Sequence, residues 1–204
     1  DSLWDVFQKK NLSRRSFLKA CVAITGIMGL SPTMIQDVVY AAENRPLPPV
    51  IWLHGHECTG CDEAFIRSET PLASDVILNM IALEDMEVLG AAAGIQLEHH
   101  AAEIMKKYAG QYLLLVEGAV PVGEDGIYCM VGGKTFEENL KEAAKGAVAV
   151  VNIGSCAAWG GIQAAKPNPT KSVAVSEVVR GKPIINIPGC PPIPEVITGT
   201  IMHY

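Results

Sequence analysis

Four cysteines in this chain have the spacing needed to share one metal centre. Cys58 and Cys61 are three residues apart and follow a short apolar run at residues 50–53. A thiol pair at this spacing occurs in iron–sulfur sites, in zinc sites and in redox disulfides, so the pair alone does not identify the chemistry. Cys156 and Cys190 each follow a further apolar run. Whether the four thiols meet depends on the elements that carry them.

Apolar runs alternate with helix-like stretches after residue 49, which predicts an α/β fold. Buried strands are expected at residues 50–53, 112–116, 147–153 and 183–187, and a further strand at 76–83. Helices are expected at residues 62–68, 89–108, 134–146, 173–180 and 194–204. Because several of the strands are apolar throughout, the sheet should be parallel and covered by helices on both faces.

The predicted strands bring the cysteines to one edge of the sheet. Ligands of an open parallel sheet bind outside the carboxyl ends of its strands. Cys58 and Cys61 follow one strand, Cys156 a second and Cys190 a third, while Glu117 follows a fourth. Four thiolates at one point suit a [4Fe–4S] cluster or a tetrahedral zinc ion. One close pair with two single cysteines favours iron–sulfur, because structural zinc sites usually use two close pairs.

Neighbouring residues leave some alternatives open. The neighbours Gly60, Gly154 and Gly189 predict that backbone approaches the cysteine sulfurs closely. His54 and His56 precede the cysteine pair and invite a zinc interpretation, which leaves Cys156 and Cys190 unexplained. Cys129 stands alone and is expected in ordinary packing.

Composition narrows the class of protein. The chain has 204 residues, of which 49% are hydrophobic and 19% charged, so one globular domain with a sizeable core is expected. The net charge of −6 and the lack of a basic stripe beyond the N-terminus argue against a nucleic-acid partner. Six cysteines are too few for a disulfide scaffold of this length, which favours a metal or catalytic use.

The N-terminal segment has the pattern of an export signal. Arg14 and Arg15 precede Phe-Leu-Lys, a moderately apolar run and the small residues Ala41 and Ala42, which resembles a twin-arginine signal. We therefore expect a signal at residues 1–41, a linker at 42–49 and the α/β domain at 50–204. Such signals serve the twin-arginine export machinery, which moves folded proteins, and this supports a cofactor inserted before export to the periplasm.

Three longer motifs carry a resemblance to a known family. They are Glu-Cys-Thr-Gly-Cys at 57–61, Gly-Ser-Cys at 154–156 running on to Gly-Gly-Ile-Gln-Ala-Ala-Lys-Pro-Asn-Pro-Thr at 160–170, and Pro-Gly-Cys-Pro-Pro at 188–192. Together they resemble the small subunit of a nickel–iron uptake hydrogenase. That family implies a flavodoxin-like, doubly wound sheet whose four cysteines hold a proximal [4Fe–4S] cluster. The ligands here would be Cys58, Cys61, Cys156 and Cys190.

The resemblance also implies partners and a reaction. The nickel–iron centre would lie on a separate large subunit, and the heterodimer would interconvert H2 with two protons and two electrons. Electrons would leave through this chain toward an acceptor such as a cytochrome, in the periplasm or at the periplasmic face of the inner membrane. The family continues into a second domain with further clusters, which this chain does not reach. Members that tolerate oxygen carry extra cysteines at positions that look like Gly60 and Gly161 here, so an oxygen-sensitive type is implied.

Residues near the predicted ligands are candidates for supporting roles. Glu57 and Thr59 flank the first ligand and are candidates for the subunit interface or a proton path. Glu117 is a candidate for a hydrogen bond near the cluster. Three other functions stay open: a zinc-stapled binding domain without redox activity, the cluster subunit of a quinone-reducing respiratory complex, and a thiol–disulfide oxidoreductase using Cys58 and Cys61.

Overall fold

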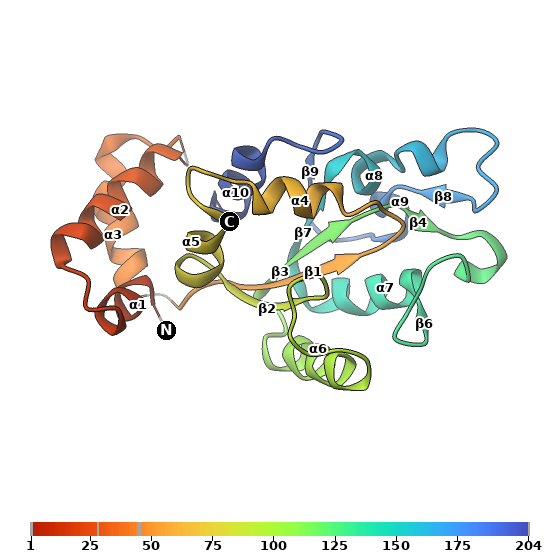
Figure 1. The fold of residues 1–204 in the computed structure, drawn as a ribbon, viewed down its shortest axis with the longest axis horizontal. Helices are drawn as coiled ribbons and strands as arrows, with labels where there is room; N and C mark the ends of the chain where they lie inside the picture. The colour runs from red at the N-terminus through yellow and green to blue at the C-terminus, as the bar shows by residue number, and fades with distance from the viewer. Residues whose placement is uncertain (1, 28, 45, 204) are drawn as a thin grey trace.

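A five-stranded parallel sheet forms the centre of the molecule (Figure 1). The computed structural model describes residues 2–27, 29–44 and 46–203. The strands are β1 (Pro49–His54), β2 (Ala82–Met86), β3 (Tyr112–Glu117), β7 (Ala147–Ile153) and β9 (Ile184–Ile187). Their order across the sheet is β2-β1-β3-β7-β9, which is the flavodoxin-like order. The prediction of a doubly wound α/β fold is therefore confirmed.

Helices cover both faces of this sheet. They are α4 (Gly60–Ile66), α5 (Ala73–Asn79), α6 (Ile95–Lys107), α7 (Phe136–Gly146), α8 (Gly154–Trp159), α9 (Val175–Val178) and α10 (Pro194–His203). Successive strand residues point to opposite faces. Trp52 therefore packs with α4, α5 and α10, whereas its neighbour Ile51 packs with α6, α7, α8 and α9. Figure 1 shows α4, α5 and α10 on the side of the sheet opposite to α6 and α7.

Short elements join these layers. β4 (Val120–Pro121) pairs with β8 (Ser172–Val173), and β5 (Met130–Val131) pairs with β6 (Lys134–Thr135), both in antiparallel fashion. Short 3-10 helices are η1 (Pro32–Met34), η2 (Gly123–Gly126) and η3 (Ile162–Ala164).

Three predicted elements differ from the structure. The expected strand at 76–83 is wrong: helix α5 occupies Ala73–Asn79, and β2 begins only at Ala82. The run is apolar at both helical and strand spacing, so its periodicity does not separate the two. The predicted helix at 89–108 begins at Ile95, after a loop with two glycines, and the predicted helix at 173–180 is shortened to α9 because its first residue pairs in β8.

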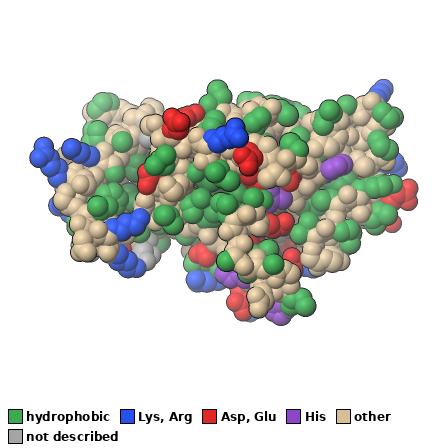
Figure 2. Space-filling view, viewed as in Figure 1, with side chains coloured by type: hydrophobic (Ala, Val, Ile, Leu, Met, Phe, Trp, Pro, Cys, Tyr) green, Lys and Arg blue, Asp and Glu red, His purple; other side chains and the backbone are tan. Residues whose placement is uncertain are grey.

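Three helices precede the sheet and pack as a group at one end of the molecule (Figure 1). They are α1 (Leu3–Lys9), α2 (Arg14–Ile27) and α3 (Ile35–Asn44). The apolar core of this group, among the described residues, consists of Leu3, Phe17, Cys21 and Ile24, and Met202 of α10 packs against it. Lys and Arg side chains gather mainly over this end in Figure 2. Among the described residues, no helix combines the length and apolar character needed to span a membrane.

Candidate metal centre

All four predicted cysteine ligands line one cavity of about 90 Å³. Cys58 lies in the loop after β1, Cys61 in the first turn of α4, Cys156 in α8 and Cys190 in the loop after β9. The remaining lining residues are Glu57, Gly60, Glu117, Ser155, Gly189 and Pro191. The structure therefore brings together the thiols that the strand pattern predicted to converge.

The cavity lies at the point where the strand order reverses. β1 has β2 on one side and β3 on the other, and residues 54 and 117 are directly paired at the ends of β1 and β3. The chain turns in opposite directions where it leaves β1 and where it leaves β3, and this opens a crevice at the carboxyl edge of the sheet. The loop carrying Cys58 and the end of β3 at Glu117 line this crevice, and the loops after β7 and β9 complete it.

The electrostatics of the thiols fit a cationic occupant. All four are free thiols in the described structure, and Cys61 is the most buried of them. Burial raises the pKa of Cys61 strongly, and the nearby groups Glu117, Cys156 and Cys58 raise it further. Burial also raises the pKa of Cys156, while the neighbouring Gln163 side chain acts to lower it. A bound metal cation converts such thiols into thiolate ligands. The four cysteines therefore fit an iron–sulfur cluster or a zinc ion.

Glycine backbone packs against three of the sulfurs. A Cβ atom on Gly154 would lie 2.5 Å from Sγ of Cys61, and one on Gly161 would lie 2.6 Å from Sγ of Cys156. The corresponding distance from Gly60 to Sγ of Cys58 is 3.3 Å. The predicted close approach is thus confirmed for Gly60 and Gly154, and the contact of Gly161 adds to it.

The approach of Gly189 to a sulfur stays a prediction, and a Cβ added there would meet Pro192, 2.4 Å from its Cα. The carbonyl of Gly189 accepts hydrogen bonds from the backbone N–H and the hydroxyl of Ser155, at 2.7 and 3.0 Å. This pair ties the turn before Cys156 to the turn before Cys190. Two ligands from separate strands are thereby held at a fixed spacing.

Glu117 lies against the cysteine pair, where the sequence left its role open. Its side chain is 1% exposed, and Oε1 accepts a hydrogen bond of 3.1 Å from the backbone N–H of Cys61. Burial raises the pKa of Glu117 to about 8, and the negative charge of the neighbouring Asp62 contributes to this rise. The carboxyl group therefore supports the turn that carries Cys61.

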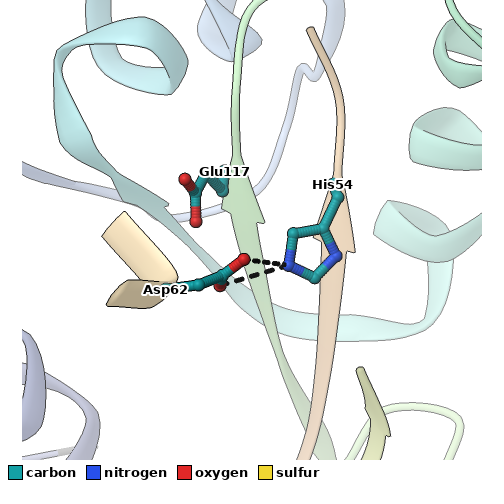
Figure 3. Close-up of side chains that lie close together, drawn as sticks. All are labelled: His54, Asp62 and Glu117. Atoms are coloured by element: carbon teal, nitrogen blue, oxygen red, sulfur yellow. Dashed lines mark hydrogen bonds and ion pairs between the residues drawn. The ribbon is translucent and has the colours of Figure 1, made fainter. Parts of the chain in front are cut away.

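A buried histidine and aspartate adjoin Glu117 and were missed as a pair by sequence reasoning. Nε2 of His54 lies 3.2 Å from Oδ1 and 3.1 Å from Oδ2 of Asp62 (Figure 3). One ligand atom from each of His54, Asp62 and Glu117 falls within 4.8 Å of the others. Hydrogen bonding to Asp62 and its charge raise the pKa of His54, outweighing the burial that lowers it.

The two histidines do not join the cysteine pair as zinc ligands. His54 faces Asp62, and Nδ1 of His56 lies 3.3 Å from the hydroxyl of Ser172. Neither histidine lines the cysteine cavity. Cys129 is half-buried and packs against the core of α7 and the sheet, as predicted.

Glu57 and Thr59 flank Cys58 as the sequence indicates. Thr59 has a left-handed backbone, with φ of 64°, where the chain reverses into α4. Glu57 lines the cavity, and burial raises the pKa of its carboxyl. Oε2 of Glu57 has no hydrogen-bond partner among the described residues.

Residues 58–204 match the family model described as NADH ubiquinone oxidoreductase, 20 Kd subunit. The chain belongs to this family. It is 50% identical over 203 residues to the uptake hydrogenase small subunits of Azotobacter vinelandii and of Cupriavidus necator, covering all of this chain and 57% and 56% of those proteins. The chain thus spans somewhat more than half the length of these relatives.

Solved structures agree with the sequence matches. The [NiFeSe] hydrogenase from Desulfovibrio vulgaris Hildenborough has a chain that is 39% identical and aligns with a TM-score of 0.75 over 78% of this chain and 59% of its own. The Ni-Fe-Se hydrogenase from Desulfomicrobium baculatum aligns with the same TM-score and 36% identity over 76% of this chain and 61% of its own. The resemblance drawn from the three cysteine motifs is confirmed.

Proposed function

We propose that this chain is the electron-transfer part of a nickel–iron hydrogenase small subunit. Cys58, Cys61, Cys156 and Cys190 would hold a proximal [4Fe–4S] cluster, which when bound supplies a one-electron carrier. The observation that carries the proposal is the convergence of these four thiols on one cavity at the carboxyl edge of the sheet. The 50% identity to uptake hydrogenase small subunits along the whole chain supports it.

The chain's own residues would hold, shield and orient the cluster. Cys61, the most buried ligand, would anchor it against the sheet, while the exposed Cys58 and Cys190 would face the outside. Glycine backbone at Gly154 and Gly161 excludes water from beside two sulfurs. Burial and hydrogen bonding of this kind set the potential of iron–sulfur clusters.

Exposed apolar side chains beside the cavity support docking of a hydrogenase large subunit. Trp159, Ile162 and Ile193 are 58%, 84% and 64% exposed, and each lies within six residues of Cys156 or Cys190. Apolar groups this exposed around a functional site are typical of a protein interface. The nickel–iron chemistry would belong to that partner, and Glu57 and Thr59 would lie near the same interface.

The remaining predictions from the sequence complete the proposal. Residues 1–41 would be the twin-arginine signal read at Arg14 and Arg15, residues 42–49 a linker, and residues 50–204 the proximal-cluster domain. Export would take the folded chain to the periplasm or to the periplasmic face of the inner membrane, with a cytochrome as a candidate acceptor. Further clusters would belong to a C-terminal domain beyond this segment. Glycines at positions 60 and 161 favour an oxygen-sensitive type.

Three rival functions are weaker on specific grounds. The first rival is the cluster subunit of a quinone-reducing complex, and the family model takes its description from such a complex. That model matches only from residue 58, whereas the hydrogenase relatives also align over the N-terminal segment. A zinc-stapled binding domain accounts for four thiols but not for that similarity. A thiol–disulfide enzyme would use Cys58 and Cys61 alone and leave Cys156 and Cys190 in the same cavity without a role.

The proposal is tested by copurification and hydrogen reduction. The chain, continued by its C-terminal domain, is expressed without oxygen together with the hydrogenase large subunit. We expect a nickel-containing heterodimer in which H2 reduces the cluster, seen as a paramagnetic signal by EPR. A heterodimer that contains nickel but no iron–sulfur signal after H2 would contradict the proposal.

A further inference from the structure

The buried pair of His54 and Asp62 adjoins the turn that carries Cys61, and neither residue lines the cysteine cavity. His54 is the last residue of β1, and Asp62 follows Cys61 in the first turn of α4. Their side chains are 6% and 0% exposed. A buried carboxylate without a partner is strongly unfavourable, so the N–H donated by Nε2 of His54 fixes where Asp62 can lie.

Cys61 is consequently held from two adjacent strands. Its own backbone N–H is bound by Glu117 of β3, and the residue that follows it is bound by His54 of β1. His54 and Glu117 are direct register partners in the sheet. The two side chains that hold the turn at Cys61 therefore come from paired residues of adjacent strands. Figure 3 shows the carboxylates of Asp62 and Glu117 side by side next to the imidazole of His54.

We propose that His54 is a positioning residue for the cluster, which fixes the Sγ atom of Cys61 by holding Asp62 in the first turn of α4. This inference rests on the proposed function, since it concerns the same centre. It goes beyond that function by assigning a role to a side chain that does not line the cavity. Groups that orient metal ligands in this way typically change metal affinity by about 10–100-fold when they are lost.

Two substitutions separate positioning from ordinary packing. The ring of His54 stacks on Trp52, with an interplanar angle of 6° and a centroid distance of 6.3 Å. His54→Phe keeps a ring in this stack but has no donor for Asp62. His54→Gln loses the ring but keeps an N–H donor at a similar distance from the backbone. A packing role predicts that Phe is tolerated and Gln is not, whereas positioning predicts the reverse.

The test compares cluster stability in the anaerobically purified heterodimer, with His100→Gln as a control at an exposed histidine that bonds the carbonyl of Glu84. The rate of iron loss to a chelator and the EPR-monitored midpoint potential are measured. We expect iron loss to be at least tenfold faster in His54→Phe and within about twofold of the wild type in His54→Gln and His100→Gln. A shift of 59 mV would correspond to a tenfold change in the one-electron ratio of reduced to oxidised cluster.

Each outcome decides the inference. A His54→Phe protein with wild-type iron loss and potential would overturn it, as would a folded His54→Gln protein that loses iron tenfold faster. If His54→Phe does not fold by circular dichroism, Asp62→Ala replaces it: faster iron loss supports positioning, and unchanged iron loss overturns it. A wild-type protein that carries zinc without sulfide overturns the proposed function together with this inference, so the two failures are distinguishable.

Discussion

Gly154 is the residue whose side-chain size the site restricts most directly. Its φ of 83° lies in the left-handed region, and an added Cβ would lie 2.5 Å from Sγ of Cys61. For Gly154→Ala we expect a backbone cost of about 1–2 kcal/mol together with displacement of the sulfur and loss of iron. Urea unfolding and iron analysis measure the two effects.

Gly133→Ala is the matched control for this substitution. Gly133 has a φ of 80° but no atom within 4 Å of the added Cβ. It should lose about 1–2 kcal/mol of unfolding free energy and keep its iron. Equal iron content in the two variants would contradict the role given to Gly154.

Asp85 is a buried carboxyl away from the cysteines, and its titration gives a pH prediction. Burial raises its pKa to about 6 from 3.8, and Oδ1 has no hydrogen-bond partner among the described residues. The folded state therefore binds the extra proton, and the free energy of unfolding falls as pH rises from about 4 through 6. Asp85→Asn should raise the unfolding free energy by up to about 3 kcal/mol at pH 8 and leave it unchanged at pH 4.

Denaturation of both proteins across this pH range measures the difference. A pH-independent difference would show that Asp85 does not ionise on unfolding as proposed. Asp85→Ala serves as a second comparison, because it removes the carboxyl without introducing a buried amide.

The four cysteines could be predicted from sequence because each follows a strand, and strand ends of a parallel sheet meet at one edge. The pair of His54 and Asp62 could not. These residues are eight apart, and their contact depends on the left-handed turn at Thr59, a residue type that gives little warning of that conformation. Burial of Glu117 likewise follows from helices packed over the strand end, which its local sequence does not reveal.

At the scale of elements, β7 matches its predicted bounds because an apolar run, interrupted by Asn152 alone, is bounded by Gly146 and Gly154. α5 and β2 were mispredicted as one strand because the same apolar residues suit either spacing. The chain there must reach the sheet edge beside β1, so tertiary pairing selects which part is strand. The type of an element could therefore be predicted where the length of the apolar run and the residues that bound it indicate the same structure, as at β7. It could not be predicted where the apolar run suits a helix and a strand equally, as at α5 and β2.

The N-terminus of α7 provides a prediction at this scale. Thr135 accepts a hydrogen bond from the N–H of Glu138, whose carboxylate accepts one from the N–H of Thr135. Thr135→Ala removes the first bond and should lower the unfolding free energy by about 1 kcal/mol, as loss of a helix cap does. Urea denaturation measures this, with Thr200→Ala as control, because the half-buried Thr200 has its hydroxyl inside α10 and caps no helix. Equal stability of Thr135→Ala and the wild type would contradict the capping role.

At the scale of the whole molecule, the exposed apolar side chains that follow Cys156 and Cys190 form the surface that we propose to bind the large subunit. Ile162 is 84% exposed in η3, which follows α8. Ile162→Glu should weaken binding of the large subunit at least tenfold without changing the fold, because it places a charge in an apolar contact. Affinity measurement by surface plasmon resonance tests this.

Ile95→Glu is the control for the surface prediction, since Ile95 is 79% exposed but begins α6, a helix that contributes no residue to the lining of the cysteine cavity. It should leave the affinity unchanged. Equal weakening by both variants would show that the effect is not specific to the surface beside the cysteines.

The metal and sulfide content of the anaerobically purified chain, compared between Cys156→Ala and Cys129→Ala, decides whether the four thiols hold an iron–sulfur cluster. A [4Fe–4S] cluster predicts about four irons with labile sulfide in the wild type and in Cys129→Ala, and loss or marked depletion of both in Cys156→Ala. One zinc ion per chain without sulfide would contradict it, because a zinc-stapled domain carries no electrons.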